Sequence, residues 1–126
     1  MADIVGIQPA NLLVTGTAAV NTALTATLPA VAGQFHYITG IELIKLYSVI
    51  GVASGAGVIV TTTNMPGSLA FTTEQLALAA GSASRVIAWF PSAPLRSSVL
   101  NTATTFVAPQ QLQTIWRWNV FYYTDV

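Results

Sequence analysis

Charged side chains are scarce in this 126-residue sequence, which has four basic and four acidic residues and therefore no net charge. They make up 6% of the residues, against about 25% in ordinary soluble domains. A free monomer resists association through mixed surface charge and a net charge away from zero. The composition therefore favours a protein whose surface is largely covered in an assembly over a monomer coated in Thr, Ser, Asn and Gln.

Clustered basic residues and cysteine are both absent. Binding to a phosphate backbone requires grouped Lys and Arg, and the four basic residues here are scattered along the sequence. We therefore expect no nucleic-acid partner. The lack of cysteine excludes a disulfide framework and thiolate chemistry.

Long uninterrupted apolar runs are also lacking, although the mean hydropathy is +0.64. Thr, Asn, Gly and Pro interrupt each run before it reaches the roughly 20 apolar residues of a spanning helix. Asp3 stands where a secretion signal would carry basic residues. The sequence predicts no membrane association and no secretion by the standard route.

Motifs of catalysis are missing as well. His36 is the single histidine, so neither a second His nor a Cys completes an ordinary transition-metal site. No nucleophile elbow or phosphate-binding loop occurs, and the carboxylates are too scattered to predict an acid–base pair: Asp3, Glu42, Glu74 and Asp125. We predict a protein that is not an enzyme, with no catalytic residue, cofactor or metal. His36, set in an apolar strand, is interpreted as a packed or half-exposed structural residue, with a pH switch as the alternative.

The stretch Thr114–Thr124, TIWRWNVFYYT, is the clearest strand in the sequence, because aromatic and β-branched residues suit a pleated, half-buried surface. Alternation places one apolar set on one face, and we expect this set to line the core: Trp116, Trp118, Val120 and Tyr122. The opposite face is mixed and is expected to lie nearest a subunit boundary: Ile115, Arg117, Asn119, Phe121 and Tyr123.

Turn signals divide the rest of the chain into further strands. These are expected at Asn11–Thr17, Val20–Leu28, Gln34–Ile50, Val58–Thr63, Arg85–Phe90 and Thr102–Ala108, with one short helix at Thr73–Ala80. Residues 1–10 resemble an arm, and residues 11–126 a single domain. With about seven or eight strands and at most one short helix, the pattern predicts an all-β, antiparallel, jelly-roll-like sandwich.

Gln34–Ile50 is long for a strand and is expected to bend or bulge at Gly40. Alternation assigns Phe35, Tyr37, Ile41 and Leu43 to one face and Ile38, Ile44 and Leu46 to the other. A helix over Ile41–Val49 is the competing interpretation, but the β-branched and aromatic content favours a strand.

Three charges lie inside these apolar strands: Glu42, Lys45 and Arg117. In one interpretation all three reach solvent. In the other, Glu42 pairs with Arg117 or Arg96, within the fold or across a subunit boundary, because an unpaired charge is costly to desolvate. A sugar-binding face of Trp116, Trp118 and Tyr122 is a further possibility, but packing is the commoner fate of such rings.

Four segments, in chain order, resemble small virion-associated proteins of tailed bacteriophages: AGQFHYITGIEL (Ala32–Leu43), TTTNMPG (Thr61–Gly67), PLRSSVLNTATTFVAP (Pro94–Pro109) and WRWNVFYYTD (Trp116–Asp125). The resemblance spans roughly residues 11–126 and rests on β-rich, Thr- and Ala-rich segments rather than on a catalytic motif. It implies a β-sandwich protein that decorates or cements a phage capsid, typically as a trimer bound to the major capsid protein.

The expected function is therefore that of a capsid decoration protein located on the virion surface, with itself and the major capsid protein as partners. The expected interface residues are Glu42, Arg96, Arg117, Phe121 and Tyr123. Two alternatives stay open: a carbohydrate-binding or host-attachment module of a tail fibre, and a structural component of the neck or baseplate. Exposed parallel rings in a groove favour the carbohydrate module, and rings buried between subunits favour a structural role.

Overall fold

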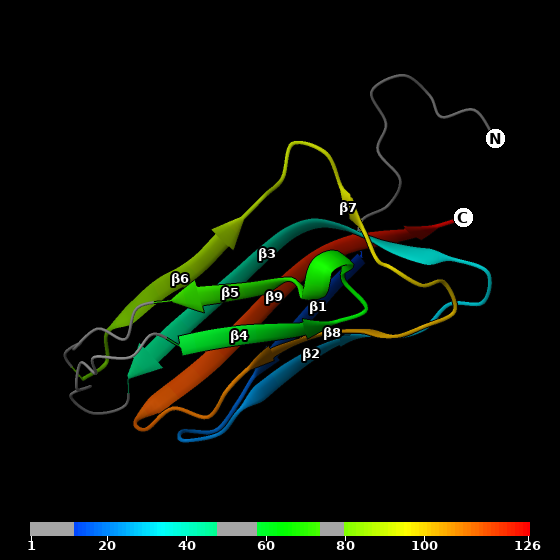
Figure 1. Cartoon of the computed structure of the whole chain (residues 1–126). Helices are drawn as coiled ribbons and strands as arrows, with labels where there is room; N and C mark the ends of the chain where they lie inside the picture. Colours follow the sequence, from blue (N-terminus) through cyan, green and yellow to red (C-terminus); the bar gives the residue numbers. More distant parts are fainter. Residues whose placement is uncertain (1–11, 48–57, 74–79) are drawn as a thin grey trace.

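The computed structural model describes residues 12–47, 58–73 and 80–126, and these form two packed β-sheets (Figure 1). The one short helical element in this part of the chain is a 3₁₀ turn at Pro66–Ser68. Nine strands occur in the described residues: β1 (Leu12–Thr17), β2 (Leu24–Leu28), β3 (Phe35–Tyr47), β4 (Val58–Thr63), β5 (Ala70–Thr73), β6 (Ala83–Trp89), β7 (Leu95–Arg96), β8 (Thr104–Ala108) and β9 (Thr114–Asp125).

The strand order is that of a jelly roll. The larger sheet has the order β1-β9-β3-β6, with the short β7 also paired to β3, and the smaller sheet has the order β2-β8-β4-β5. The antiparallel pairs β1–β9, β2–β8, β3–β6 and β4–β5 are nested, so the chain resembles one long hairpin rolled into two layers. The prediction of an all-β antiparallel sandwich of the jelly-roll kind is confirmed.

The core lies between the two sheets and is supplied by alternate residues of each strand. On β9, Trp116, Trp118 and Val120 are fully buried and Tyr122 nearly so, as the alternation predicts. Phe106 of β8 faces Trp118, with ring centroids 6.0 Å apart. The two indoles are also anchored by hydrogen bonds, because Trp116 Nε1 donates to the Pro109 carbonyl and Trp118 Nε1 to the Leu24 carbonyl of β2.

A bulge in β3 reverses the faces of that strand. The register with β9 shifts between Ile38 and Gly40, which confirms the bulge expected near Gly40. One extra residue moves every later side chain to the opposite face. Phe35 and Tyr37 therefore point outward while Ile41 and Leu43 are buried, so the assignment of all four to one face was wrong.

Most expected strands are present, but several bounds differ, and two short strands, β5 and β7, were not expected. β2 begins at Leu24 rather than at Val20, and Val20 is exposed. β5 and β7, of four and two residues, are too short for alternation to reveal. Thr73, where a helix was expected to begin, belongs to β5. Residues 74–79 of that expected helix, and the expected arm at residues 1–10, lie outside the described residues.

Three asparagines join loops that are distant in the sequence. Asn21, Asn64 and Asn101 each have φ between 58° and 59°, a left-handed conformation that asparagine tolerates better than most residues. In each case the side-chain carbonyl accepts a hydrogen bond from a backbone N–H of another loop: from Gln113, Val99 and Gly33, respectively. These contacts tie the loops together at the two ends of the sandwich.

Candidate functional site

The outer face of the larger sheet gathers the residues that the sequence assigned to an interface. Antiparallel partners share a face, so the register sets Phe121 beside Leu13, Asn119 beside Glu42, and Arg117 beside Ile44. Arg96 of β7 is paired with Tyr37 of β3 at the same side. All five expected interface residues therefore lie on one surface, which we call the outer face: Glu42, Arg96, Arg117, Phe121 and Tyr123.

Five rings form an aromatic patch on the outer face: Phe35, Tyr37, Phe90, Phe121 and Tyr123. Tyr37 and Tyr123 are cross-strand neighbours whose rings stack with centroids 5.0 Å apart and planes 4° apart. Phe90 lies next to Phe121, with centroids 6.1 Å apart. Phe90 is 57% exposed and the other four rings are half-buried, so the patch is accessible on this face of the chain.

Gly40 positions the most exposed ring of the aromatic patch. A Cβ placed on Gly40 would lie 2.4 Å from two ring carbons of Phe90 and 3.3 Å from the Phe121 ring. The Phe90 ring therefore occupies the volume that any other residue at position 40 would fill. The bulge and the missing side chain together bring Phe90, from the end of β6, over the middle of β3.

The far end of the aromatic patch contacts a cation and the backbone of Val126. The Arg96 guanidinium lies over the Phe35 ring, 4.3 Å from its centroid, and the Tyr37 hydroxyl donates to the Val126 carbonyl. Burial, together with the neighbouring Tyr37 and the Asp125 carboxylate, raises the pKa of the Tyr123 phenol above its usual range. Tyr123 is consequently a neutral hydrogen-bonding group at physiological pH.

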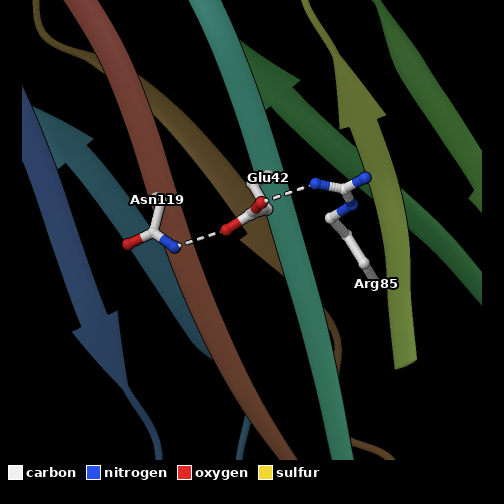
Figure 2. A network of polar contacts seen from close by, with 3 residues as sticks. All are labelled: Glu42, Arg85 and Asn119. Carbon is white, nitrogen blue, oxygen red and sulfur yellow. Dashed lines mark hydrogen bonds and ion pairs between the residues drawn. The ribbon is translucent and has the colours of Figure 1, made fainter. Parts of the chain in front are cut away.

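A polar cluster crosses the middle of the outer face (Figure 2). Glu42 on β3 accepts a hydrogen bond from Asn119 of β9 at 2.8 Å and forms an ion pair with Arg85 of β6 at 3.2 Å. The Asn119 hydrogen bond, followed by the Arg85 contact, lowers the pKa of Glu42, and the nearby charge of Arg117 acts in the same direction. Because Glu42 pairs with Arg85, the expected pairing with Arg117 or Arg96 within the fold is wrong.

Trp116, Trp118 and Tyr122 do not form a sugar-binding face. Their rings lie in the core between the sheets, with exposed fractions of 0%, 0% and 5%. Packing was the favoured interpretation of these residues, and it is confirmed. The aromatic patch, by contrast, lies on the opposite face of the same sheet and is accessible.

Lys45 lies in the core rather than in solvent. The bulge turns it inward, and its side chain is 1% exposed. Its ammonium lies 5.3 Å from the centroid of the Tyr47 ring and 5.4 Å from that of Trp116. Within the described residues Lys45 Nζ has no hydrogen-bond partner, so the aromatic rings are the groups that offset its desolvation.

His36 is a buried structural residue. Its Nε2 lies 2.8 Å from the Pro29 carbonyl, which can only accept, so Nε2 carries the proton. Its Nδ1 lies 2.8 Å from the Thr104 hydroxyl, which also receives a hydrogen bond from Asn64. These contacts join β3 of the larger sheet to β8 of the smaller one. The interpretation of His36 as a packed residue is confirmed.

The described part of the chain contains no cluster of three or more His, Cys, Asp or Glu side chains suited to a metal ion. It contains no helix long and apolar enough to cross a membrane. Comparison of the sequence with protein-family models, and of the chain with curated proteins and solved structures, found no match. The residues of the outer face are therefore the features of this protein that bear on its function.

Sequence reasoning missed three of the five rings in the aromatic patch, Phe35, Tyr37 and Phe90. Simple alternation put the first two on the same face as Ile41 and Leu43, whereas the bulge in β3 separates them. Phe90 was taken as the end of a strand before Pro91. The signal that could have found it is Gly40, since a glycine inside a long apolar strand often marks the close approach of another group.

Proposed function

We propose that this protein is a structural virion component that decorates and stabilises a bacteriophage capsid, with the outer face of the larger sheet as its docking surface. The observation that carries the proposal is the aromatic patch, an accessible set of five rings. The same outer face carries Arg85, Arg96 and Arg117. Aromatic residues and arginine are enriched in protein interfaces. In a chain with 6% charged residues, such a surface is poorly suited to remain in water.

The fold agrees with this proposal without establishing it. Viral capsid proteins and lectins both use double-sheet jelly rolls, and a fold alone does not define a function. The resemblance of four segments to small virion proteins of tailed phages favours the capsid over the lectin. We propose no catalytic activity, nucleic-acid partner or membrane partner, and we place the protein on the capsid surface after synthesis in the host cytoplasm.

The arrangement of the tyrosines favours a protein partner over a sugar. A sugar-binding platform presents flat ring faces to its ligand, whereas Tyr37 and Tyr123 each cover one face of the other. Their remaining surface, with Phe90 and Phe121, suits an irregular apolar contact. The carbohydrate-binding or host-attachment module therefore ranks second, and the neck or baseplate component third.

The mechanism follows from multivalent burial of this face. A homo-oligomer, a trimer if the resemblance holds, would span neighbouring copies of the major capsid protein. Each contact would remove apolar surface from water at about 25 cal/mol per Å². One released contact would stay close to its site while the others hold, so detachment would be slow. The capsid would then resist heat without any change in the sequence of the major capsid protein.

The experiment uses capsids of the encoding phage produced without this chain. We expect these capsids to assemble and to lose heat tolerance, and added purified protein to co-sediment with them and restore it. Phe90→Glu should weaken co-sedimentation at least about tenfold, because it places a charge in the aromatic patch. Thr27→Glu, on the exposed side of β2 in the smaller sheet, is the matched control and should bind normally.

Two results would contradict the proposal. Unchanged heat tolerance of capsids that lack the chain would exclude a cementing role. Equal co-sedimentation of the Phe90 and Thr27 variants would exclude the outer face as the docking surface. Binding to a glycan array that Phe90→Glu abolishes, without binding to capsids, would support the carbohydrate module instead. Recovery of the chain with purified tails rather than heads would support the neck or baseplate.

A further inference from the structure

Among the described residues, the edge of β1 that faces away from β9 has no strand partner, and exposed leucines lie beside it. In the described residues, β1 pairs with β9 along one side and with no strand along the other. The Ala18 N–H, which continues the same register, donates to the Trp116 carbonyl of β9. Because N–H and C=O groups alternate in direction along a strand, Leu13, Thr15 and Thr17 direct theirs away from β9. This edge therefore offers an alternating set of donors and acceptors.

β1 lacks the features that normally protect such an edge. Proteins discourage edge pairing with charges, prolines or bulges. The sequence of β1, LLVTGT, has no charge and no proline, and its register with β9 is continuous. The edge strand on the other side of this sheet, β6, has two of these features. It carries the exposed charge of Arg85, and its pairing with β3 contains a bulge.

The side chains of β1 also distinguish it from the open edges of the smaller sheet. Leu12 and Leu13 are 44% and 52% exposed at the start of β1. The exposed positions within β2, by contrast, are Thr25 and Thr27, which water solvates readily. Open backbone groups and exposed leucines coincide only at β1 among the described strands that form edges.

We propose that β1 pairs with β1 of a second copy of this chain, antiparallel, about a two-fold axis at Thr15. That axis sets Leu13 opposite Thr17 of the second copy and Thr15 opposite its own equivalent. The outward-directed residues of one strand then meet those of the other as hydrogen-bonded pairs. Thr–Thr is among the favourable cross-strand pairs. A second copy of β1 presents the same three outward-directed residues in the opposite order, so the two edges match along their length. A strand of a different protein would need a sequence that matches these residues.

The pairing joins two larger sheets into one continuous sheet with their outer faces on the same side. Two aromatic patches then face one partner surface, so that attachment becomes bivalent. The dimer does not depend on the proposed capsid function, because β1 and the aromatic patch are separate groups of residues. If a three-fold association also holds, the two-fold pairing produces assemblies with an even number of chains.

Charge variants of Thr15 test the two-fold axis directly, because a residue on the axis meets itself. Sedimentation velocity over a range of concentrations should show an assembly with an even number of chains for the natural sequence. Thr15→Lys alone and Thr15→Glu alone should each weaken it about fivefold or more, since like charges then lie opposite each other. An equimolar mixture of the two variants should restore it, because each Lys then meets a Glu.

Thr25→Lys and Thr25→Glu on β2 are the matched controls and should leave the mass unchanged. A monomer of the natural sequence at all concentrations would overturn the proposal. So would an assembly that the Thr15 variants do not weaken, or a mixture that does not recover. Capsid binding separates the two proposals, because Phe90→Glu should lose co-sedimentation and keep the pairing, whereas the Thr15 variants should lose the pairing.

A cross-link provides a second readout that needs no loss of stability. The chain has no cysteine, so Thr15→Cys introduces its only thiol. Opposed residues of a hydrogen-bonded pair lie about 5.5 Å apart at Cα, within the range that a disulfide spans. Mild oxidation should give a covalent dimer of this variant and none of Ser92→Cys, whose thiol lies in an exposed loop. Equal cross-linking of both variants would contradict the two-fold axis at Thr15.

Discussion

The two faces of the larger sheet are built from the same strands and similar residues, yet one is buried and the other is accessible. The inner face of β9 presents two tryptophans that are fully buried and hydrogen-bonded to backbone carbonyls. The outer face presents stacked tyrosines, three phenylalanines and an ion pair that remain accessible. Aromatic content alone therefore does not indicate a core. Removal of inner residues should affect folding, and removal of outer residues should affect association.

The largest expected effect is on the inner face, at Trp118. Trp118→Ala should lower the free energy of unfolding by about 3–5 kcal/mol, because it leaves a cavity beside Phe106 and an unpaired Leu24 carbonyl. Trp118→Phe keeps most of the volume and should cost less. Guanidinium unfolding measures both. A comparable loss from Phe90→Glu would show that the two faces do not divide stability and association as described.

The next effect has the opposite sign. Lys45→Met should raise the free energy of unfolding by about 1–2 kcal/mol, because it removes a buried ammonium that has no hydrogen-bond partner among the described residues. The lost contacts with the Tyr47 and Trp116 rings offset part of this gain. Lys45→Gln, which keeps a buried polar group, should give no such increase. If Lys45→Met is less stable than the natural chain, the ammonium is better satisfied in solution than these contacts indicate.

The smallest effect is on the outer face and depends on pH. The pKa of Glu42 is lowered from its ordinary value of 4.5 in the folded chain, so the folded state favours the carboxylate. Its contribution is present above pH 4.5 and is lost as the pH falls through the lower pKa of the folded state. Glu42→Gln should cost less than about 1 kcal/mol at neutral pH. It should also flatten the acid limb of a stability-against-pH curve, and an unchanged limb would contradict the cluster.

Sequence patterns predicted β9 well and β3 only in part, for a physical reason. The polar and apolar residues of β9 alternate clearly enough to identify its buried face. In β3 both alternating sets are largely apolar, so the pattern could not show that the residues after the bulge at Gly40 change faces. Alternation alone therefore put Phe35 and Tyr37 on the same face as Ile41 and Leu43, and it did not show that Lys45 is buried. The partner of Glu42 was also beyond prediction, because Arg85 reaches it only through the order β9-β3-β6.

The nested strand order has a consequence for synthesis of the chain. β9 lies between β1 and β3 in the larger sheet, although it follows them by many residues in the sequence. Until Thr114–Asp125 has left the ribosome, that sheet lacks one of its two inner strands, and the facing edges of β1 and β3 have no partner. Pairings this distant in sequence form slowly, and open edges invite contact with other nascent chains. Nascent copies that are translated close together can therefore aggregate until β9, the most aromatic strand, has been synthesised.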